Sequence, residues 1–199
     1  MKIIARGAEA IIYEDGDEII KYRERKKYRL PEIDAPMRKS RTKREFTALS
    51  ACHRAGLNVP KPVKISAEGD KLYMEKIEGE QFDSAFSVEK MSDVGVLLAA
   101  ISKLGIVHGD LTTANILVKR GQVYLIDFGL SYFSKKDEDR ATDLFLFKNA
   151  LKSRHPDDAK KAYKLFIEAY EAAMGKEFHG FFIECYQIFG QLFFYLSAF

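Results

Sequence analysis

Short apolar runs separated by turn-forming residues dominate the first third of the chain. Runs of this length, bounded by Gly, Asp and Pro, are typical of strands in a small antiparallel sheet. Asp15–Asp17 has the composition of a hairpin turn, and so has Gly69–Asp70. The predicted strands are Ile3–Ile4, Ala10–Tyr13, Glu18–Tyr22, Pro60–Ala67 and Lys71–Lys76.

A helical spacing of apolar residues interrupts this series of strands. Phe46, Leu49 and His53 lie three and four residues apart, which places them on one face of a helix over Lys39–Ala55. The preceding segment, Tyr28–Pro36, holds two prolines, and we therefore predict a loop there. The first third of the chain is thus expected to be a small sheet with one helix.

Helical periodicity dominates the remainder of the chain. Helices are predicted over Val88–Leu104, Arg140–Ser153 and Asp157–Met174, and a hairpin over residues 116–126 follows a polar loop over residues 107–115. A β-rich half followed by a helical half predicts an α+β fold with two lobes. We place these lobes at residues 1–76 and 77–199, with a cleft between them near Lys76–Gly79.

Charge adds one local feature to this pattern. The chain has 199 residues, 31% of them charged, and its formal net charge is only +3. Basic residues nevertheless concentrate between Lys21 and Arg44, where only Glu24, Glu32 and Asp34 oppose them. This cluster is either a solvated helix face with its loop or a surface that faces phosphates or nucleic acid.

Cysteines and the C-terminal segment bear on location. Cys52 and Cys185 form neither a metal-binding pair nor a disulfide framework, which fits a reducing cytosol and a cytoplasmic protein. The segment Gly180–Phe199 has the length of a membrane span, but Glu184 and two glutamines interrupt it. We therefore expect a buried terminal helix there, and no membrane attachment.

The most informative stretch is His108-Gly-Asp-Leu-Thr-Thr-Ala-Asn115, which an apolar hairpin and Asp127-Phe-Gly129 follow. Phosphoryl transfer needs metal ligands at the triphosphate, a cation on its phosphates and a base that orients the acceptor. Asp110, Asn115 and Asp127 supply oxygen ligands of the kind that Mg²⁺ prefers. This pattern resembles the protein-kinase superfamily, in which Asp110 matches the catalytic-loop Asp and the other two match metal-binding residues.

That resemblance implies further site residues in the β-rich half. Lys21, at the end of a predicted strand, matches the lysine that touches the α- and β-phosphates of ATP, and Glu45 matches its ion-pair partner. Backbone N–H groups of Gly7 and Ala8 are expected to approach phosphate in a loop poorer in glycine than that of ordinary kinases. Residues of the expected hinge would bind adenine, Glu75 and Ile77 through their backbone and Met74 along the back of the pocket.

A narrower resemblance is to the PRPK-type family, the small atypical kinase of the KEOPS complex, which is related to the RIO kinases. The segments that carry it are Gly7–Ala10, Tyr28–Asp34, Arg41–Glu45, Met74–Gly79, His108–Asn115 and Asp139–Leu144. It implies an ATPase and Ser/Thr kinase that supports threonylcarbamoyl-adenosine formation in tRNA. It also implies a threonylcarbamoyl-transferring partner, a small subunit on the first lobe, and tRNA as a candidate ligand of the Lys21–Arg44 region.

Two features distinguish the chain from ordinary protein kinases. Only ten residues, Leu130–Asp139, separate Gly129 from the next predicted helix, and no Ala-Pro-Glu motif follows, so the usual peptide platform is missing. His108-Gly-Asp110 lacks the arginine that reads a phosphorylated activation loop. Members of the PRPK-type family usually end in a short basic tail, whereas residues 177–199 here are aromatic and nearly uncharged.

Two alternatives to this function stay open on the sequence alone. A small-molecule phosphotransferase of the aminoglycoside or choline kinase type would use the same arrangement of Asp110, Asn115 and Asp127. A scaffold with a kinase fold and no catalysis would fail to bind Mg-ATP. His108 is expected to support the catalytic loop, and Asp143 either to bind that loop's backbone or to lie exposed in its helix.

Overall fold

A computed structural model describes residues 1–175 of the chain, and the predicted helix over Gly180–Phe199 lies outside these residues. Its first half is a five-stranded antiparallel sheet in the order β1-β2-β3-β5-β4. The strands are β1 (Lys2–Arg6), β2 (Ile11–Asp15), β3 (Glu18–Tyr22), β4 (Pro62–Ile65) and β5 (Lys71–Glu75). Each strand predicted from the sequence is present, with ends that differ by a few residues.

The hairpin between β2 and β3 fixes the position of Lys21. Gly16 adopts a φ of 60° in the two-residue turn, a conformation that glycine tolerates without steric cost. The register pairs Lys21 with Ile12 of β2 on one side and with Leu72 of β5 on the other. Lys21 therefore lies in the central strand of the sheet.

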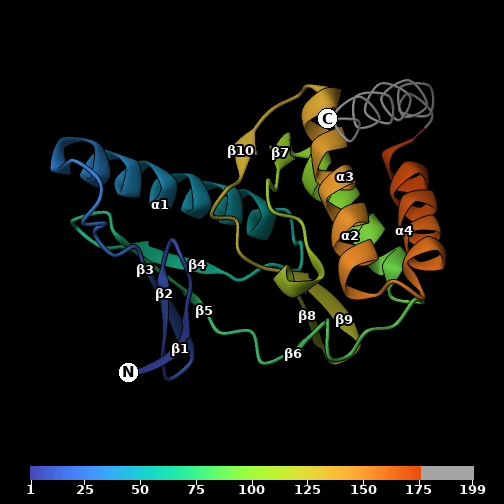
Figure 1. Ribbon diagram of the computed structural model, residues 1–199, viewed down its shortest axis with the longest axis horizontal. Coiled ribbons are helices and arrows are strands. Elements are labelled where there is room, and N and C mark those ends of the chain that lie inside the picture. Colours follow the sequence, from blue (N-terminus) through green and yellow to red (C-terminus); the bar gives the residue numbers. More distant parts are fainter. Residues whose placement is uncertain (176–199) are drawn as a thin grey trace.

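Helix α1 (Pro31–Arg54) is longer than the sequence predicted, and the predicted loop over Tyr28–Pro36 is wrong. Pro31 opens the helix, where a missing N–H costs nothing because the first N–H groups of a helix have no internal partner. Pro36 lies inside the helix, at an exposed end that extends beyond the sheet (Figure 1). Buried Asp34 anchors this end, since Arg38 Nε lies 2.7 Å from its Oδ2.

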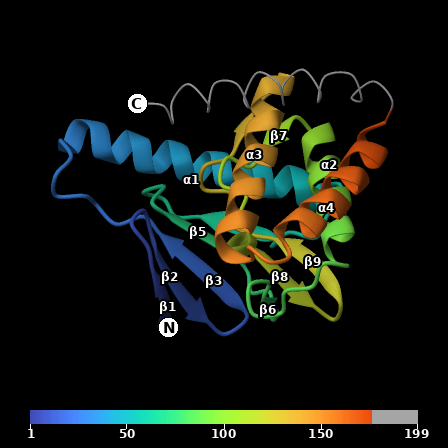
Figure 2. The same cartoon turned by 45° about the vertical axis from the view of Figure 1, so that its right-hand side comes forward.

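Up to residue 175, the second half combines three α-helices with two small sheets. Helices α2 (Met91–Lys103), α3 (Asp137–Arg154) and α4 (Ala159–Met174) gather away from the first sheet (Figure 2). Strands β6 (Glu80–Gln81), β8 (Ile116–Lys119) and β9 (Gln122–Leu125) form one sheet, and β7 (Ile106–Val107) and β10 (Tyr132–Phe133) form the other. The short helix η1 (Thr113–Asn115) precedes β8.

Close packing of α2 against α4 forms the base of the helical half. A Cβ atom at Gly95 of α2 would lie 2.3 Å from the carbonyl oxygen of Phe166 in α4, so only glycine allows this approach. Phe147, Phe166 and Tyr170 are fully buried around the contact. Ala48, Leu49 and Cys52 of α1 belong to the same hydrophobic core, which joins the sheet-bearing half to the helical half.

The α+β fold with a β-rich first half and a helical second half is confirmed. The lobe boundary between residues 76 and 77 stays a prediction, placed just after β5 ends at Glu75. Within residues 1–175, no helix is both long and apolar enough to cross a membrane.

Candidate active site

A cleft of about 390 Å³ lies where the first sheet meets the β8–β9 hairpin. Its size is within the usual range for small-molecule pockets. Apolar side chains line one part of it: Ile12, Ile19, Met74, Leu117 and Ile126. Charged and amide side chains line the other: Lys21, Glu45, Asn115 and Asp127. Such a cleft suits a ligand with one apolar and one anionic end.

Lys21 links the two sides of the polar part. Its Nζ lies 2.8 Å from Oε1 of Glu45 and 2.5 Å from Oδ1 of Asp127. The Lys21 and Glu45 side chains are almost fully buried, whereas that of Asp127 is 44% exposed. The structure therefore brings together three residues that the sequence assigned to one site, although they lie far apart along the chain.

The pKa of Lys21 reflects two opposing effects. Burial alone would lower it, but the carboxylates of Glu45 and Asp127 outweigh burial and raise the pKa above its ordinary value. For Asp127, burial works toward a higher pKa, but the charge and hydrogen bond of Lys21 lower it below its usual value. Lys21 therefore stays protonated and Asp127 ionised at neutral pH.

Asp127 adopts a backbone conformation that is rare for residues other than glycine. Its φ is 62°, and its Oδ1 accepts a hydrogen bond of 3.1 Å from the N–H of Gly129. Left-handed conformations at such residues cost free energy and cluster at functional sites. Here the conformation directs the carboxylate toward Lys21.

Asn115 lines the cleft and contacts Asp110 of the same loop, which is not among the residues that line it. Asn115 Nδ2 donates to the carbonyl oxygen of Asp110 at 2.8 Å and to its Oδ2 at 3.2 Å. Because the Asn115 amide nitrogen is used in this way, its side-chain oxygen remains as an acceptor for a ligand. The residue Asp110 is exposed, so its carboxylate is open to an incoming group.

His108 supports the loop from within the core. It is fully buried, its Nδ1 accepts from the N–H of Asp110 at 3.3 Å, and its Nε2 lies 3.1 Å from the carbonyl oxygen of Ile126. Both contacts are satisfied by the neutral ring with its proton on Nε2. The ring also packs on Phe128, with 4.8 Å between centroids. His108 therefore joins the catalytic loop to the segment that carries Asp127.

Asp143 of α3 is buried and binds the backbone of the catalytic loop. Of the two roles that the sequence left open for Asp143, the structure therefore shows the loop contact and not the exposed position. Its two carboxylate oxygens accept from the N–H groups of His108 at 2.6 Å and of Gly109 at 2.7 Å. Gly109 has a φ of 78°, and a Cβ there would lie 2.6 Å from the carbonyl oxygen of Leu130. Burial raises the pKa of Asp143, although the hydrogen bonds that it accepts from the backbone N–H groups of His108 and Gly109 oppose that shift.

Gly7 and Ala8 lie in the β1–β2 connection and are not among the residues that line the cleft. The N–H of Gly7 donates to the carbonyl oxygen of Ala10 at 2.9 Å, within the loop itself. The neighbouring Glu9 is tied to helix α1, since Arg41 NH1 lies 2.5 Å from its Oε2. Arg29 NH2 lies 3.4 Å from the other oxygen.

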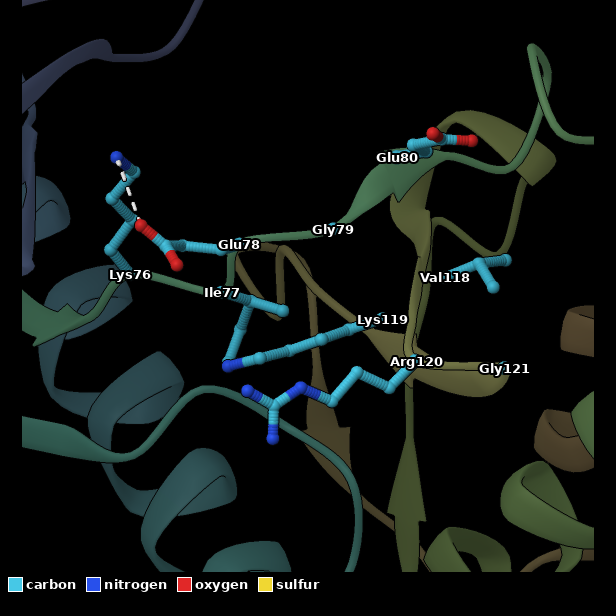
Figure 3. A pocket seen from close by; sticks show the side chains of 9 residues that line it. All are labelled: Lys76, Ile77, Glu78, Gly79, Glu80, Val118, Lys119, Arg120 and Gly121. Atoms are coloured by element: carbon cyan, nitrogen blue, oxygen red, sulfur yellow. Dashed lines mark ion pairs between the residues drawn. The ribbon is translucent and has the colours of Figure 1, made fainter.

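The expected hinge runs along the edge of the cleft. Met74 and Ile77 both line it, and the backbone N–H of Glu75 already donates to the carbonyl oxygen of Lys61 at 2.9 Å. Just outside, a hollow of about 690 Å³ separates the hinge from the β8–β9 turn, with Lys119 and Arg120 beneath Ile77 (Figure 3). The hinge therefore has an apolar inner side and a charged outer side.

The basic residues between Lys21 and Arg44 are used in two ways. Lys21 and Arg23 are buried, and three arginines form ion pairs with Glu9, Asp34 or Asp70: Arg29, Arg38 and Arg41. Lys26 is half-buried, and the other members of the cluster are exposed: Arg25, Lys27, Lys39, Lys43 and Arg44. The sequence alone could not separate these two groups.

The model of the RIO domain family matches residues 7–146, and thus covers most of the chain. Among solved structures, the chain is similar to the Rio2 kinase of Chaetomium thermophilum in its complex with ADP/Mg²⁺ and phosphoaspartate. The TM-score is 0.60 at 17% identity, over 93% of this chain and 69% of that one, which supports the fold. The family match and the fold thus define a RIO-type, kinase-like class of protein.

Curated relatives narrow the class. The chain is 42% identical over 160 residues to the EKC/KEOPS complex subunit BUD32 of Encephalitozoon cuniculi, covering 78% of this chain and 79% of that protein. It is 36% identical to the KEOPS complex subunit Bud32 of Pyrococcus abyssi, over 89% and 88% of the two chains. The chain belongs to the RIO domain family and, within it, to the Bud32 group of proteins.

A third relative is a longer protein. The probable bifunctional tRNA threonylcarbamoyladenosine biosynthesis protein of Methanothermobacter thermautotrophicus is 38% identical over 173 residues. The match covers 84% of this chain but 32% of that protein. The similarity is therefore confined to one part of that longer protein.

Proposed function

We propose that the chain is an atypical serine/threonine protein kinase and ATPase that acts in a KEOPS complex and supports threonylcarbamoyl-adenosine modification of tRNA. The observation that carries the catalytic part is Lys21, which lies between Glu45 and Asp127 in a cleft that Asn115 also lines. The names of the Bud32 relatives support the biological setting.

Each residue of the site has a distinct role in this proposal. Lys21, held by Glu45, would orient the α- and β-phosphates of ATP. Asp110 would accept a proton from a Ser/Thr hydroxyl, or orient a water molecule, in line with the γ-phosphate. Its exposed position leaves room for either acceptor. His108 and Asp143 would keep the loop in place without taking part in the reaction.

The residues present fit Mg²⁺ with ATP. The partly exposed carboxylate of Asp127 and the side-chain oxygen of Asn115 are hard ligands, and Mg²⁺ commonly binds one or two such groups together with substrate phosphates. Among residues 1–175, no cluster of three or more His, Cys, Asp or Glu could hold a metal without such help. Bound Mg²⁺ would neutralise negative charge on the phosphate oxygens. The backbones of Glu75 and Ile77 would bind adenine, Met74 would line the back of its pocket, and the N–H groups of Gly7 and Ala8 would approach phosphate.

The proposal includes partners. These are a threonylcarbamoyl-transferring subunit, a small subunit on the sheet-bearing half, and tRNA. A tRNA contact within the Lys21–Arg44 region would use its exposed cations, because the buried and paired ones are already engaged. A cytoplasmic location is part of the same proposal and agrees with a free, buried Cys52.

The test is phosphate release from Mg-ATP by the purified chain, alone and with the threonylcarbamoyl-transferring subunit and tRNA. Asp110→Ala serves as the blank, and Asp157→Ala, at an exposed position far from the cleft in sequence, serves as the matched control. We expect release that rises with partner or tRNA, is lost in Asp110→Ala and is retained in Asp157→Ala.

Other outcomes would favour the alternatives. Release that ignores partner and tRNA but responds to small alcohols or aminoglycosides would indicate a small-molecule phosphotransferase. A chain that neither binds nor hydrolyses Mg-ATP would be a scaffold, and the catalytic part of the proposal would be wrong.

A further inference from the structure

Arg23, which the sequence places in the basic cluster, is buried. It follows β3, its side chain is 4% exposed, and its NH2 lies 2.6 Å from Oε2 of Glu45. A guanidinium removed from water in this way needs a carboxylate partner, because a buried unpaired charge is strongly destabilising. Arg23 is therefore part of the interior of the site and not of the surface.

Glu45 thus receives two cations, one on each oxygen. Lys21 contacts Oε1 at 2.8 Å and Arg23 contacts Oε2 at 2.6 Å. Lys21 and Arg23 are two residues apart, so an extended chain directs both side chains to the same face of the sheet. Glu45 itself is 1% exposed. The contact with Arg23 would keep Glu45 in place even when Lys21 contacts another group.

The same guanidinium reaches the segment that carries Asp127. A Cβ at Gly129 would lie 3.0 Å from Arg23 NH2, 3.1 Å from Lys21 Nζ and 3.0 Å from Asp127 Oδ1. Glycine at this position leaves room for both cations beside Asp127. Arg23 therefore spans from the sheet-bearing half to the segment after the catalytic loop.

The four charged groups of this cluster balance, with two cations and two carboxylates. On the proposed function, Lys21 has to contact phosphates and Asp127 has to contact the metal, so each loses part of its present pairing. Without Arg23, Glu45 would then be a buried carboxylate with no cation, and it would attract Lys21 away from the phosphates. With Arg23, Glu45 keeps a full ion pair throughout.

We propose that Arg23 is a positioning residue for phosphoryl transfer, which holds Glu45 by an ion pair of its own and so leaves Lys21 able to engage the phosphates. This inference rests on the proposed function. It assigns no contact between Arg23 and the substrate; Arg23 acts through Glu45.

The test compares Arg23→Gln with Arg54→Gln, since Arg54 is an exposed arginine at the end of α1, outside the Lys21–Arg44 region. Groups that orient metal ligands typically cost about 10- to 100-fold in activity when removed, and we expect a similar range for a group that orients Glu45. We expect kcat/KM for Mg-ATP to fall by about that factor in Arg23→Gln and to stay unchanged in Arg54→Gln. Arg23→Lys should restore part of the loss, because it keeps the charge but not the planar set of donors of the guanidinium.

A double-mutant cycle with Glu45→Gln separates positioning from general support of the fold. If Arg23 acts through Glu45, the additional effect of Arg23→Gln in the Glu45→Gln background should fall below about twofold. An equal loss in both backgrounds would overturn the proposal, and so would unchanged activity of Arg23→Gln. Should Arg23→Gln fail to fold, Arg23→Lys in the same cycle gives the decision. Inactivity of the unmutated chain with its partner and tRNA would instead overturn the proposed function and this inference with it.

Discussion

Glu45 and Asp127 both bind Lys21, yet they lie in two different environments. Glu45, on helix α1, is 1% exposed and each of its oxygens is bound by a cation. Asp127, after the β8–β9 hairpin, is 44% exposed and has Lys21 as its cation. One carboxylate is fixed and the other is open to a ligand. The site therefore has two halves. The fixed half consists of β3 and α1, which carry Lys21 and Glu45, and the open half consists of residues 108–127, whose side chains can exchange partners.

Asp127→Ala should have the largest effect. It removes the proposed metal ligand and a partner of Lys21 together, and we expect phosphate release to fall by about a thousandfold or more. Phosphate release at saturating Mg²⁺ would measure this, with Asp157→Ala as the matched control. Normal turnover in Asp127→Ala would contradict both the site assignment and the contrast drawn above.

Asp143→Ala tests whether the catalytic loop depends on its anchor in α3. Two backbone N–H groups, of His108 and Gly109, would lose their acceptor. Because buried donors without an acceptor are destabilising, we expect Asp143→Ala to lower the free energy of unfolding by about 3 kcal/mol. Urea denaturation would measure this loss. Asp143→Asn retains one acceptor oxygen and should lose less. Equal stability of both variants and the unmutated chain would contradict the anchoring role.

The smallest effect is expected at Glu9, an ion-paired carboxylate that is 42% exposed. Water and salt screen exposed ion pairs, so Glu9→Gln should change the free energy of unfolding by less than about 1 kcal/mol, and less again in high salt. Glu45→Gln, which leaves two buried cations without their full partner, should cost about 3–5 kcal/mol. Thermal unfolding of the two variants side by side would measure the difference, and similar losses would contradict it.

Most of the open half could be predicted from the sequence, because its polar residues lie close together along the chain. The spacing from His108 through Asn115 to Asp127 implies a loop and a hairpin that end at one place. The contact between Asp110 and Asn115, five residues apart, follows from the tight turn between them. The roles assigned to these residues remain predictions that the experiments above address.

The fixed half was harder to predict because tertiary contacts override its local signals. Two prolines indicated a loop before residue 39, but Pro31 can open a helix, and Arg38 stabilises its first turns by binding buried Asp34. Arg23 is indistinguishable in composition from its exposed neighbours. Only burial against Glu45 sets it apart, and burial is not encoded in any local pattern.

The pairing of β7 with β10 was also missed. Each strand has two residues, too few to show an alternation of apolar and polar side chains. The segment is held further by Asp139, which accepts from Ser134 Oγ at 2.6 Å and from Tyr132 at 3.2 Å. These contacts join residues close in sequence, but hydroxyl and carboxyl groups at such spacing are common in loops of every kind.

That short, tied-down segment has a consequence for selectivity. It leaves Leu130 and Phe133 about half exposed beside the catalytic loop, with Asp110 open near them. Residues 129–136 form no wall that would select groups approaching Asp110 by their size or shape. On the proposed function, discrimination between water, a hydroxyl of a protein and any other acceptor would therefore come from whichever neighbour covers this face, and the chain alone would be an undiscriminating catalyst.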